Sequence, residues 1–294
     1  MIAGITPDRG LTPEKARNEL AQLCQKAEGG RHDLGRSGLL LALLEKPGSA
    51  LTPYTRHLEK LAREINAYAS AGGRIETKDL TLDLALEALA QVFVTRYGYN
   101  GSADVFDDPD GANMMAVIDN RSGLPVVLGA ILIHVGRMIG WDVAGVNFPA
   151  RFLVRLDVGD ERALLDPFDH LKRVESQGLR RMLKGLSGRK AELVPGHYQE
   201  AGDNDILIRI LNNVKLRHLR AENFADAINT IDLMLTIEPQ KPEIWREAGL
   251  LHARLDNVPE AIRSLESYLR YETSDPDLYR MSALIQELRS RLKR

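Results

Sequence analysis

Few side chains in this sequence have the type and spacing that covalent chemistry requires. Cys24 is the only cysteine among the 294 residues. A thiolate nucleophile needs a base within hydrogen-bond reach, and the sequence offers Cys24 no plausible one. We therefore expect Cys24 to be a small buried apolar group without a catalytic role.

Two histidines are the other candidates. Ser122 and His134 lie twelve residues apart, which is about 18 Å along a helix and too far for a nucleophile–base bond, although a fold-back before Pro125 could shorten it. We expect His134 to be a hydrogen-bonded core residue. His252 and Asp256 have helical spacing, but a metal site would need two more ligands, so we expect a surface pair. We predict no metal and no cofactor.

The elements that would position these residues change character along the chain. The first hundred residues have a helical pattern, with typical helix starts at Thr12-Pro13 and Thr52-Pro53. An apolar helix is predicted from Pro125 to about Gly140. Short β-type runs follow at 143–148, 152–156 and 163–165, with a hairpin turn at 157–160. The middle of the chain should therefore be a helix packed on a small antiparallel sheet.

The last ninety residues contain an internal repeat. Asp226-Ala227-Ile228 corresponds to Glu260-Ala261-Ile262, 34 residues later. Trp245, Gly249 and Pro239 also fall where a tetratricopeptide unit has its aromatic, its small residue and its final proline. We predict about two such helical pairs, followed by a capping helix from Pro276 to Leu292.

Composition restricts the class of protein. Hydrophobic residues make up 44% and the formal net charge is −2. This charge disfavours broad binding to nucleic acid, which needs clustered positive charge. No apolar stretch approaches the 20 or so residues of a membrane span, and residues 1–9 do not resemble a signal peptide. With a single cysteine, the expected location is cytoplasmic.

The middle segment resembles a known family, the bacterial SirB-type transglutaminase-like proteins, in which a papain/transglutaminase core precedes tetratricopeptide repeats. The matching residues are Tyr97-Gly98-Tyr99-Asn100-Gly101, Asp108-Pro109, Arg121-Ser122-Gly123-Leu124-Pro125, the run from Gly145 to Arg155, and Leu165-Asp166-Pro167-Phe168. Their order and spacing fit the family from about residue 35 onward.

The resemblance and the patterns together predict an α+β protein. It would have a helical extension at 1–34, a transglutaminase-like core with a small antiparallel sheet at 35–186, and a linker at 187–202. An all-α tetratricopeptide-like repeat domain would occupy 203–294.

The resemblance also implies where catalytic residues would stand. The nucleophile would lie at the start of the apolar helix, at Pro125, Val126 or Val127, none of which is nucleophilic. The histidine position is Arg151, and a guanidinium does not deprotonate at working pH. Only Asp166 keeps the superfamily's residue type. We expect Arg151 and Asp166 to form an ion pair in a vestigial cleft, and we predict no catalytic residues.

The sequence therefore favours a pseudoenzyme that acts as a cytosolic interaction or regulatory module for a protein or peptide partner. One alternative is a hydrolase or acyltransferase with an unrecognised catalytic set, and another is an anion or small-ligand sensor. In the repeat family, the first helices of successive units line a groove, and Leu216 and Leu250 fall on that face. The predicted peptide-binding residues in this groove are Arg209, Asn212, Asn213, Arg220, Arg246 and Arg254. A solvated charged face, or a groove filled by the last helix, is the competing interpretation.

Overall fold

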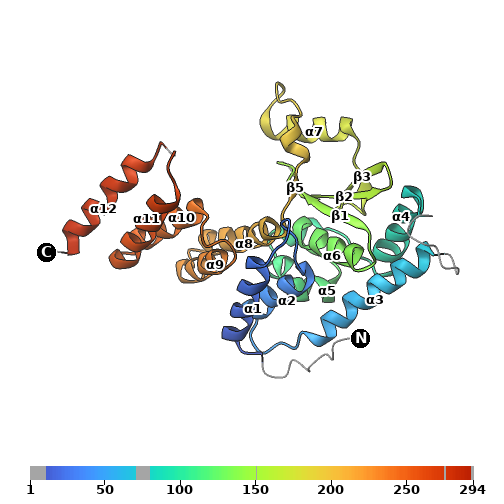
Figure 1. The fold of residues 1–294 in the computed structure, drawn as a ribbon, viewed down its shortest axis with the longest axis horizontal. Helices are drawn as coiled ribbons and strands as arrows, with labels where there is room; N and C mark the ends of the chain where they lie inside the picture. Colours follow the sequence, from blue (N-terminus) through green and yellow to red (C-terminus); the bar gives the residue numbers. More distant parts are fainter. Residues whose placement is uncertain (1–10, 71–79, 150, 275, 293–294) are drawn as a thin grey trace. The chain divides into compact units, whose positions relative to one another are not determined.

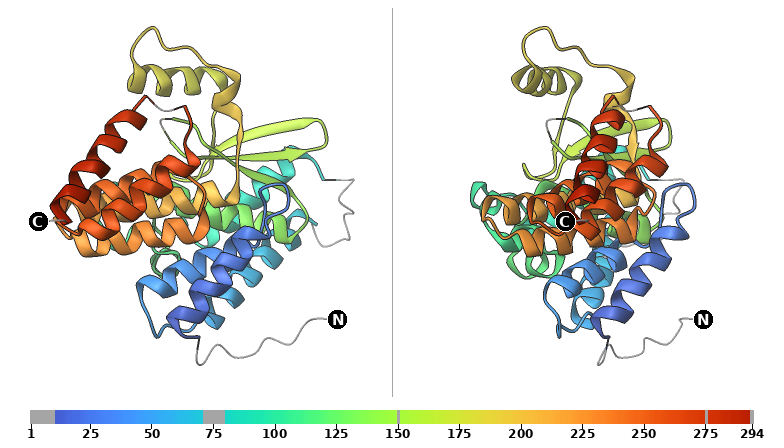
Figure 2. Two further views of the ribbon diagram at one scale, coloured as in Figure 1. Left: turned by 60° about the vertical axis from the view of Figure 1, so that its left-hand side comes forward. Right: turned by 90° about the vertical axis from the view of Figure 1, so that its left-hand side faces the viewer.

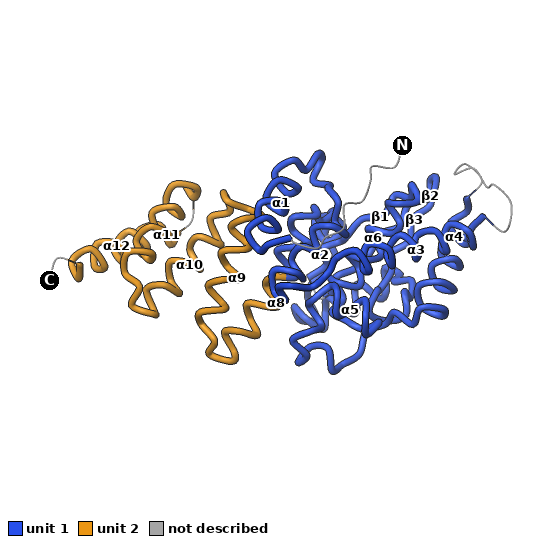
Figure 3. Tube along the Cα trace, turned by 90° about the horizontal axis from the view of Figure 1, so that it is seen from below, with its two compact units in different colours: residues 1–210 blue, residues 211–294 orange. Residues whose placement is uncertain are grey.

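The structure is a computed structural model that describes residues 11–70, 80–149, 151–274 and 276–292 (Figure 1). Residues 1–9 and Ala150 of the family motif lie outside this range. The chain forms two compact units that divide between Ile210 and Leu211 (Figure 3). Among the described residues, no helix has the length and apolar character needed to cross a membrane.

The first unit begins with helices whose starts agree with the sequence signals. Helix α1 (Pro13–Gln25) is capped by Thr12, whose hydroxyl accepts from the Lys15 amide at 3.3 Å. Helices α2 (Leu34–Glu45), α3 (Thr52–Ala69) and α4 (Leu82–Leu89) follow, and α4 continues as a π-helix, η2 (Ala90–Arg96). The side chain of Asp33 caps α2. This region is helical, as predicted.

A sheet of five antiparallel strands occupies the centre of the first unit, in the order β4-β3-β2-β1-β5. The strands are β1 (Asp142–Val146), β2 (Leu153–Val158), β3 (Glu161–Asp166), β4 (Lys172–Arg173) and β5 (Glu200–Ala201). The first three strands and the β2–β3 hairpin confirm the predicted α+β class. The short helices η3 (Ala103–Phe106), η4 (Pro109–Ala112) and α5 (Met114–Asn120) precede the sheet.

Two helices cover opposite faces of this sheet (Figures 1 and 2). Helix α6 (Pro125–Met138) approaches one face so closely that a Cβ on Gly129 would lie 2.4 Å from Phe152. Helix α7 (Ser176–Ser187) packs Leu179 and Leu183 against Leu153 on the other face. Neighbouring residues of a strand point to opposite faces, so β2 can serve both helices.

The predicted linker, 187–202, differs from the structure at its C-terminal end. Glu200 and Ala201 form β5, which pairs with Val146 and Gly145 of β1. The Asp203 carboxylate then accepts two 2.8 Å hydrogen bonds from Arg137 on α6. These contacts hold the start of α8 (Asp203–Arg220) in the first unit, so the division between units falls inside that helix.

The second unit contains the rest of α8 and the helices α9 (Phe224–Ile237), α10 (Pro242–Arg254), α11 (Val258–Tyr271) and α12 (Leu278–Leu292). Ala227 and Ala261 are both fully buried. Glu222 and Asp256 are also 34 residues apart, and both have left-handed backbone, with φ of 57° and 59°. The same turn therefore recurs at the same repeat position, and the tetratricopeptide prediction is confirmed. Helix α12 packs on α11 through Met281, Ile285 and Leu288, as a capping helix should.

Candidate functional site: an arginine–aspartate pair

The β2–β3 hairpin brings together the two polar positions that the sequence singled out. Arg151 precedes β2 and Asp166 ends β3, and the Arg151 guanidinium donates to Oδ2 of Asp166. The other oxygen, Oδ1, accepts from the Phe168 amide at 3.0 Å. Asp166 is only 2% exposed. Each oxygen of this buried carboxylate therefore needs a hydrogen-bond donor, and each has one. The expected ion pair is confirmed.

The helix start next to this strand pair carries no nucleophile. Val126 and Val127 are buried on the first turn of α6. The N-cap residue of this helix is Leu124, so no side chain caps the helix by a hydrogen bond. Just before them, the hydroxyl oxygen of Ser122 is buried and has no hydrogen-bond partner among the residues that the structure describes. The side chains of Val126 and Val127 are aliphatic and carry no nucleophilic atom.

The matched motifs build the surroundings of Asp166. The Gly101 amide donates to the Phe168 carbonyl at 3.1 Å, and a Cβ on Gly101 would lie 2.1 Å from the Phe168 ring. The Asn100 side chain accepts from the His170 amide at 3.2 Å. The Arg151 guanidinium lies 5.6 Å from the centre of the Phe168 ring. The glycine of the first motif is therefore needed so that the phenylalanine of the last motif can pack beside it.

A second polar network lies around Tyr99, and the sequence did not predict it. The Tyr99 hydroxyl is 2.9 Å from Nε2 of His57 and accepts from Arg121 at 3.1 Å. Burial lowers the pKa of His57 to about 4, and the nearby Arg121 charge acts in the same direction. Burial likewise raises the pKa of Tyr99 to about 12. In the sequence, Tyr97 and Tyr99 of the first motif indicate a polar site, but nothing in the sequence links them to His57.

The expectation that Cys24 has no base within reach is wrong. Its sulfur lies 4.0 Å from Nε2 of His32. That nitrogen is also 3.2 Å from the Asn204 side-chain oxygen, and Nδ1 of His32 is 3.1 Å from the Ser37 hydroxyl. The expectation of burial is confirmed, because Cys24 is 3% exposed. The sequence feature that could have indicated this contact is Gly29-Gly30, a turn at which the chain reverses between Cys24 and His32.

The two histidines that the sequence analysis singled out, His134 and His252, are both held by contacts within the fold. Nδ1 of His134 accepts from the Gly35 amide at 3.2 Å, and burial lowers the pKa of His134, so the expected core role is confirmed. The predicted surface pair of His252 and Asp256 is wrong. His252 is 8% exposed and its Nδ1 lies 3.3 Å from the side-chain nitrogen of Asn257, while Asp256 pairs with Arg291 of the capping helix.

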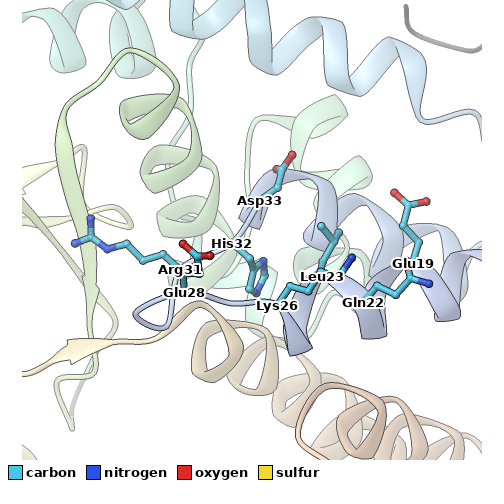
Figure 4. Close-up of a pocket in the computed structure, with 8 residues that line it drawn as sticks. All are labelled: Glu19, Gln22, Leu23, Lys26, Glu28, Arg31, His32 and Asp33. Carbon is cyan, nitrogen blue, oxygen red and sulfur yellow. The ribbon is translucent and has the colours of Figure 1, made fainter. Parts of the chain in front are cut away.

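A pocket of about 350 Å³ lies beside α1 and the following turn (Figure 4). The residues that line it are Glu19, Gln22, Leu23, Lys26, Glu28, Arg31, His32 and Asp33. Most of them are polar or charged, and Arg31 is held by ion pairs with Asp142 and Glu200. Across the residues that the structure describes, no three His, Cys, Asp or Glu side chains are gathered so that they could hold a metal ion.

The predicted groove residues are only partly together. Arg209 belongs to the first unit, where it donates to Asn147 and lies 5.7 Å from the Phe152 ring centre. Burial lowers the pKa of Arg209 below its ordinary value. Asn212 and Asn213 are half-buried on the α8 turn at the start of the second unit, and Asn212 accepts from Lys215 at 2.8 Å.

Ion pairs link successive first helices of the repeat. Arg246 of α10 lies 3.4 Å from Asp277, which immediately precedes α12, and Lys215 of α8 pairs with Glu247 of α10. The predicted position Arg246 therefore contacts the segment that leads into the capping helix. This contact supports part of the competing interpretation, a groove filled by the chain's own last helix.

Two predicted positions stay on the surface in equivalent places. Leu216 is 47% exposed and Leu250 is 42% exposed, and they stand 34 residues apart on α8 and α10. One turn after each lies an exposed arginine, Arg220 and Arg254. The Arg254 guanidinium lies 4.8 Å from the Phe224 ring centre. The second unit therefore has the same surface arrangement twice, an exposed leucine followed one turn later by an exposed arginine.

Comparison with known proteins agrees with this architecture. A model of the transglutaminase-like superfamily matches residues 52–212, and a tetratricopeptide-repeat model matches residues 214–286. A "UPF0162 protein" of Vibrio cholerae is 32% identical over 56% of this chain and 61% of its own length. "Protein SirB1" of Salmonella typhimurium is 26% identical over 58% of this chain and 64% of its own length.

The match thus spans somewhat less than two thirds of these curated relatives. Among solved structures, a menin crystal structure, titled for its binding site for the Mixed Lineage Leukemia protein, covers 94% of this chain and 75% of its own. It has 10% sequence identity and a TM-score of 0.41, at which the likeness carries no argument about function.

Proposed function

The chain belongs to the transglutaminase-like superfamily, and we propose that it is a non-catalytic member that binds a protein partner through its repeat unit. The proposal includes a cytoplasmic location, which rests on the single cysteine.

The observation that carries the non-catalytic part is the pairing of Arg151 with Asp166. In the superfamily, a histidine at the first position takes the proton and an acid at the second orients it. An arginine stays protonated at working pH, so it cannot accept that proton. With valines where the nucleophile would stand, the cleft lacks both the attacking group and the base.

The binding part rests on the repeated surface of the second unit. Each first helix exposes a leucine and, one turn later, an arginine: Leu216 with Arg220, and Leu250 with Arg254. An exposed leucine favours an apolar contact, and a guanidinium favours a carboxylate. The ligand that fits is an extended peptide in which apolar and acidic residues alternate at the spacing of the repeat.

Peptide binding can be measured directly. A panel of labelled synthetic peptides with apolar and acidic residues near the C-terminus is titrated with the full chain. Reversing both charges with Arg220→Glu and Arg254→Glu should weaken binding of the best peptide at least about tenfold, the loss expected for two charge-assisted contacts. The matched control reverses two exposed cations of α1, Lys15→Glu and Arg17→Glu. Equal binding by both double variants would contradict the proposal that the peptide binds at Arg220 and Arg254.

One contact favours an enzyme as the second candidate. The sulfur of Cys24 and Nε2 of His32 lie 4.0 Å apart, and Asn204 is next to them. However, Asn204 contacts the same nitrogen as the sulfur, whereas an orienting residue would hold the opposite nitrogen. The burial of Cys24 also keeps substrate from its sulfur.

An activity assay separates the two candidates. The full chain is incubated with peptide, amide and amine-acceptor substrates before and after iodoacetamide treatment. We expect no turnover in either sample. Turnover that iodoacetamide or Cys24→Ser abolishes would establish the enzyme and overturn the pseudoenzyme proposal.

A further inference from the structure

The pocket beside α1 is lined by one face of that helix and by the turn that leads into α2 (Figure 4). Glu19, Gln22, Leu23 and Lys26 have helical spacing, so their side chains lie along the same face of α1 and its C-cap. The rest of the lining comes from residues 28–33. The volume of about 350 Å³ is near the lower end of the range for ligand sites, about 300–1,000 Å³, so the pocket suits a small molecule.

Three of the lining residues are held in place by contacts within the first unit. The two carboxylate oxygens of Glu19 accept from Arg36 at 2.7 and 3.0 Å. The Arg31 guanidinium pairs with carboxylates of β1 and β5. The His32 amide donates to the Asp203 carboxylate at 2.9 Å. This part of the lining is therefore formed before a ligand binds, and its charges already have counter-charges.

Three other lining side chains have no such contacts. Within the described part of the chain, the side chains of Gln22, Lys26 and Glu28 make no hydrogen bond and no ion pair. Lys26 and Glu28 are only two residues apart and have opposite charges, yet no ion pair joins them. The remaining acid, Asp33, is engaged as the N-cap of α2 and accepts from the Arg36 amide at 2.8 Å. A ligand in this pocket can therefore use one ammonium, one carboxylate and one amide.

We propose that this pocket binds a free α-amino acid, whose carboxylate pairs with Lys26 and whose ammonium pairs with Glu28. The Cα atoms of these two residues can be at most about 7 Å apart, so the ligand must carry its opposite charges close together, as an α-amino acid does. The Gln22 amide can donate to the ligand carboxylate, and the half-buried Leu23 favours an aliphatic side chain. The site lies in the first unit and uses neither the repeat surface nor the Arg151–Asp166 pair.

Ligands with a single kind of charge fit this lining less well. A phosphate or a dicarboxylate would pair with Lys26 but would bring negative charge to Glu28, and the charge of Arg31 is already compensated. A polyamine would pair with Glu28 but would bring positive charge to Lys26. An uncharged ligand would take water from both groups and return no hydrogen bond. A zwitterion satisfies the two charges together.

The test titrates the full chain with three matched probes by calorimetry or NMR. The first is L-leucine, the second is 4-methylpentanoate, which lacks the ammonium, and the third is 3-methylbutylamine, which lacks the carboxylate. We expect L-leucine to bind tightest and each analogue to bind at least about tenfold more weakly, because each has lost one charge-assisted contact. The proposal is wrong if either analogue binds as tightly as L-leucine, or if L-leucine shows no binding up to about 10 mM.

Two variants test which charge each residue binds. Lys26→Gln should weaken L-leucine at least about tenfold and leave 3-methylbutylamine unchanged, because that probe has no carboxylate. Glu28→Gln should weaken L-leucine by a similar factor and leave 4-methylpentanoate unchanged. The matched controls, Glu14→Gln and Lys15→Gln, neutralise the same residue types on α1 outside the lining and should not affect binding. Equal losses in the controls, or full binding by both pocket variants, would contradict the site.

Hydrogen exchange locates the bound amino acid independently of the variants. L-leucine should slow exchange in residues 26–36 and at the start of α8, because the Gly30 carbonyl accepts from the Asp203 amide at 2.8 Å. Protection confined to α10 and α11 would place the ligand elsewhere and overturn the proposal. Arg220→Glu with Arg254→Glu should leave L-leucine binding unchanged, so the pocket and the repeat surface can fail separately. Thermal melts of all variants without ligand distinguish loss of binding from loss of folding.

Discussion

Arg151 donates a hydrogen bond to the carboxylate of Asp166, a group that is almost fully buried at the end of β3. A buried carboxylate that loses one partner keeps its desolvation cost without compensation. The pair is therefore a structural element of the cleft.

Removing one member of this pair should cost more than removing both. We expect Arg151→Ala to lower the free energy of unfolding by about 1–3 kcal/mol, because the buried Oδ2 of Asp166 then lacks a donor. Adding Asp166→Asn should recover part of that loss, since a neutral amide is cheaper to bury. Urea unfolding of the two single variants and the double variant measures the coupling. If Arg151→Ala unfolds at the same urea concentration as the wild type, the pair has no structural role.

The sequence predicted those parts of this site that depend on short-range order. Alternating residues on each side of the 157–160 turn predicted the hairpin, and the hairpin brings Arg151 to Asp166. The 34-residue period predicted the repeat, because burying Ala227 and Ala261 at equivalent places requires the same helix pair twice.

What the sequence did not predict depends on contacts between distant segments. Strand β5 has two residues in a polar stretch, too few to show a period, and it forms only because β1 offers an edge. His32 approaches Cys24 because Gly29 and Gly30 both have positive φ and reverse the chain after α1. Arg209 was assigned to the groove by repeat register, but it packs against Phe152 in the first unit.

The pH dependence of stability should reveal His57. Its pKa is about 4 in the folded chain and about 6.5 in an unfolded one, so the unfolded chain binds more protons between these values. Stability should therefore fall as the pH drops from about 6.5 to about 4. His134, whose pKa is also lowered, contributes in the same direction.

A variant isolates the contribution of His57. His57→Gln keeps a polar partner near the Tyr99 hydroxyl but cannot titrate. We expect the difference in stability between about pH 7 and about pH 4.5 to be smaller in this variant than in the wild type, by urea unfolding at both values. An NMR titration that gives His57 a midpoint near its ordinary pKa of about 6.5 would contradict the burial argument.

Cys24 should react slowly as long as the fold is intact. The sulfur is almost completely buried on the inner side of α1, next to His32, so a bulky disulfide reagent must wait for local opening. We expect its reaction with such a reagent to be at least about a hundredfold slower in buffer than in denaturant. His32→Ala removes the neighbouring imidazole and opens space, so it should accelerate the reaction. A fast reaction in the native wild type would indicate an accessible thiolate and reopen the question of catalysis.

The close contact between α10 and α11 gives the last prediction. A Cβ on Gly249 would lie 2.6 Å from the side chain of Leu265 and 3.2 Å from its backbone nitrogen. Alanine normally favours a helix over glycine by about 1 kcal/mol, but here it must push α11 away, and overpacking costs about 1–3 kcal/mol. Gly249→Ala should therefore destabilise the second unit.

The matched control is Gly185→Ala on α7, where nothing lies within 4 Å of the added Cβ. That variant should be neutral or more stable by about 0.5–1 kcal/mol, because only helix propensity changes. Hydrogen exchange resolved by segment should show faster exchange in α10 and α11 of Gly249→Ala, with the sheet of the first unit unchanged. If the two variants have the same stability, the glycine is not required for packing of the repeat. The 34-residue period would then not depend on close approach at this position.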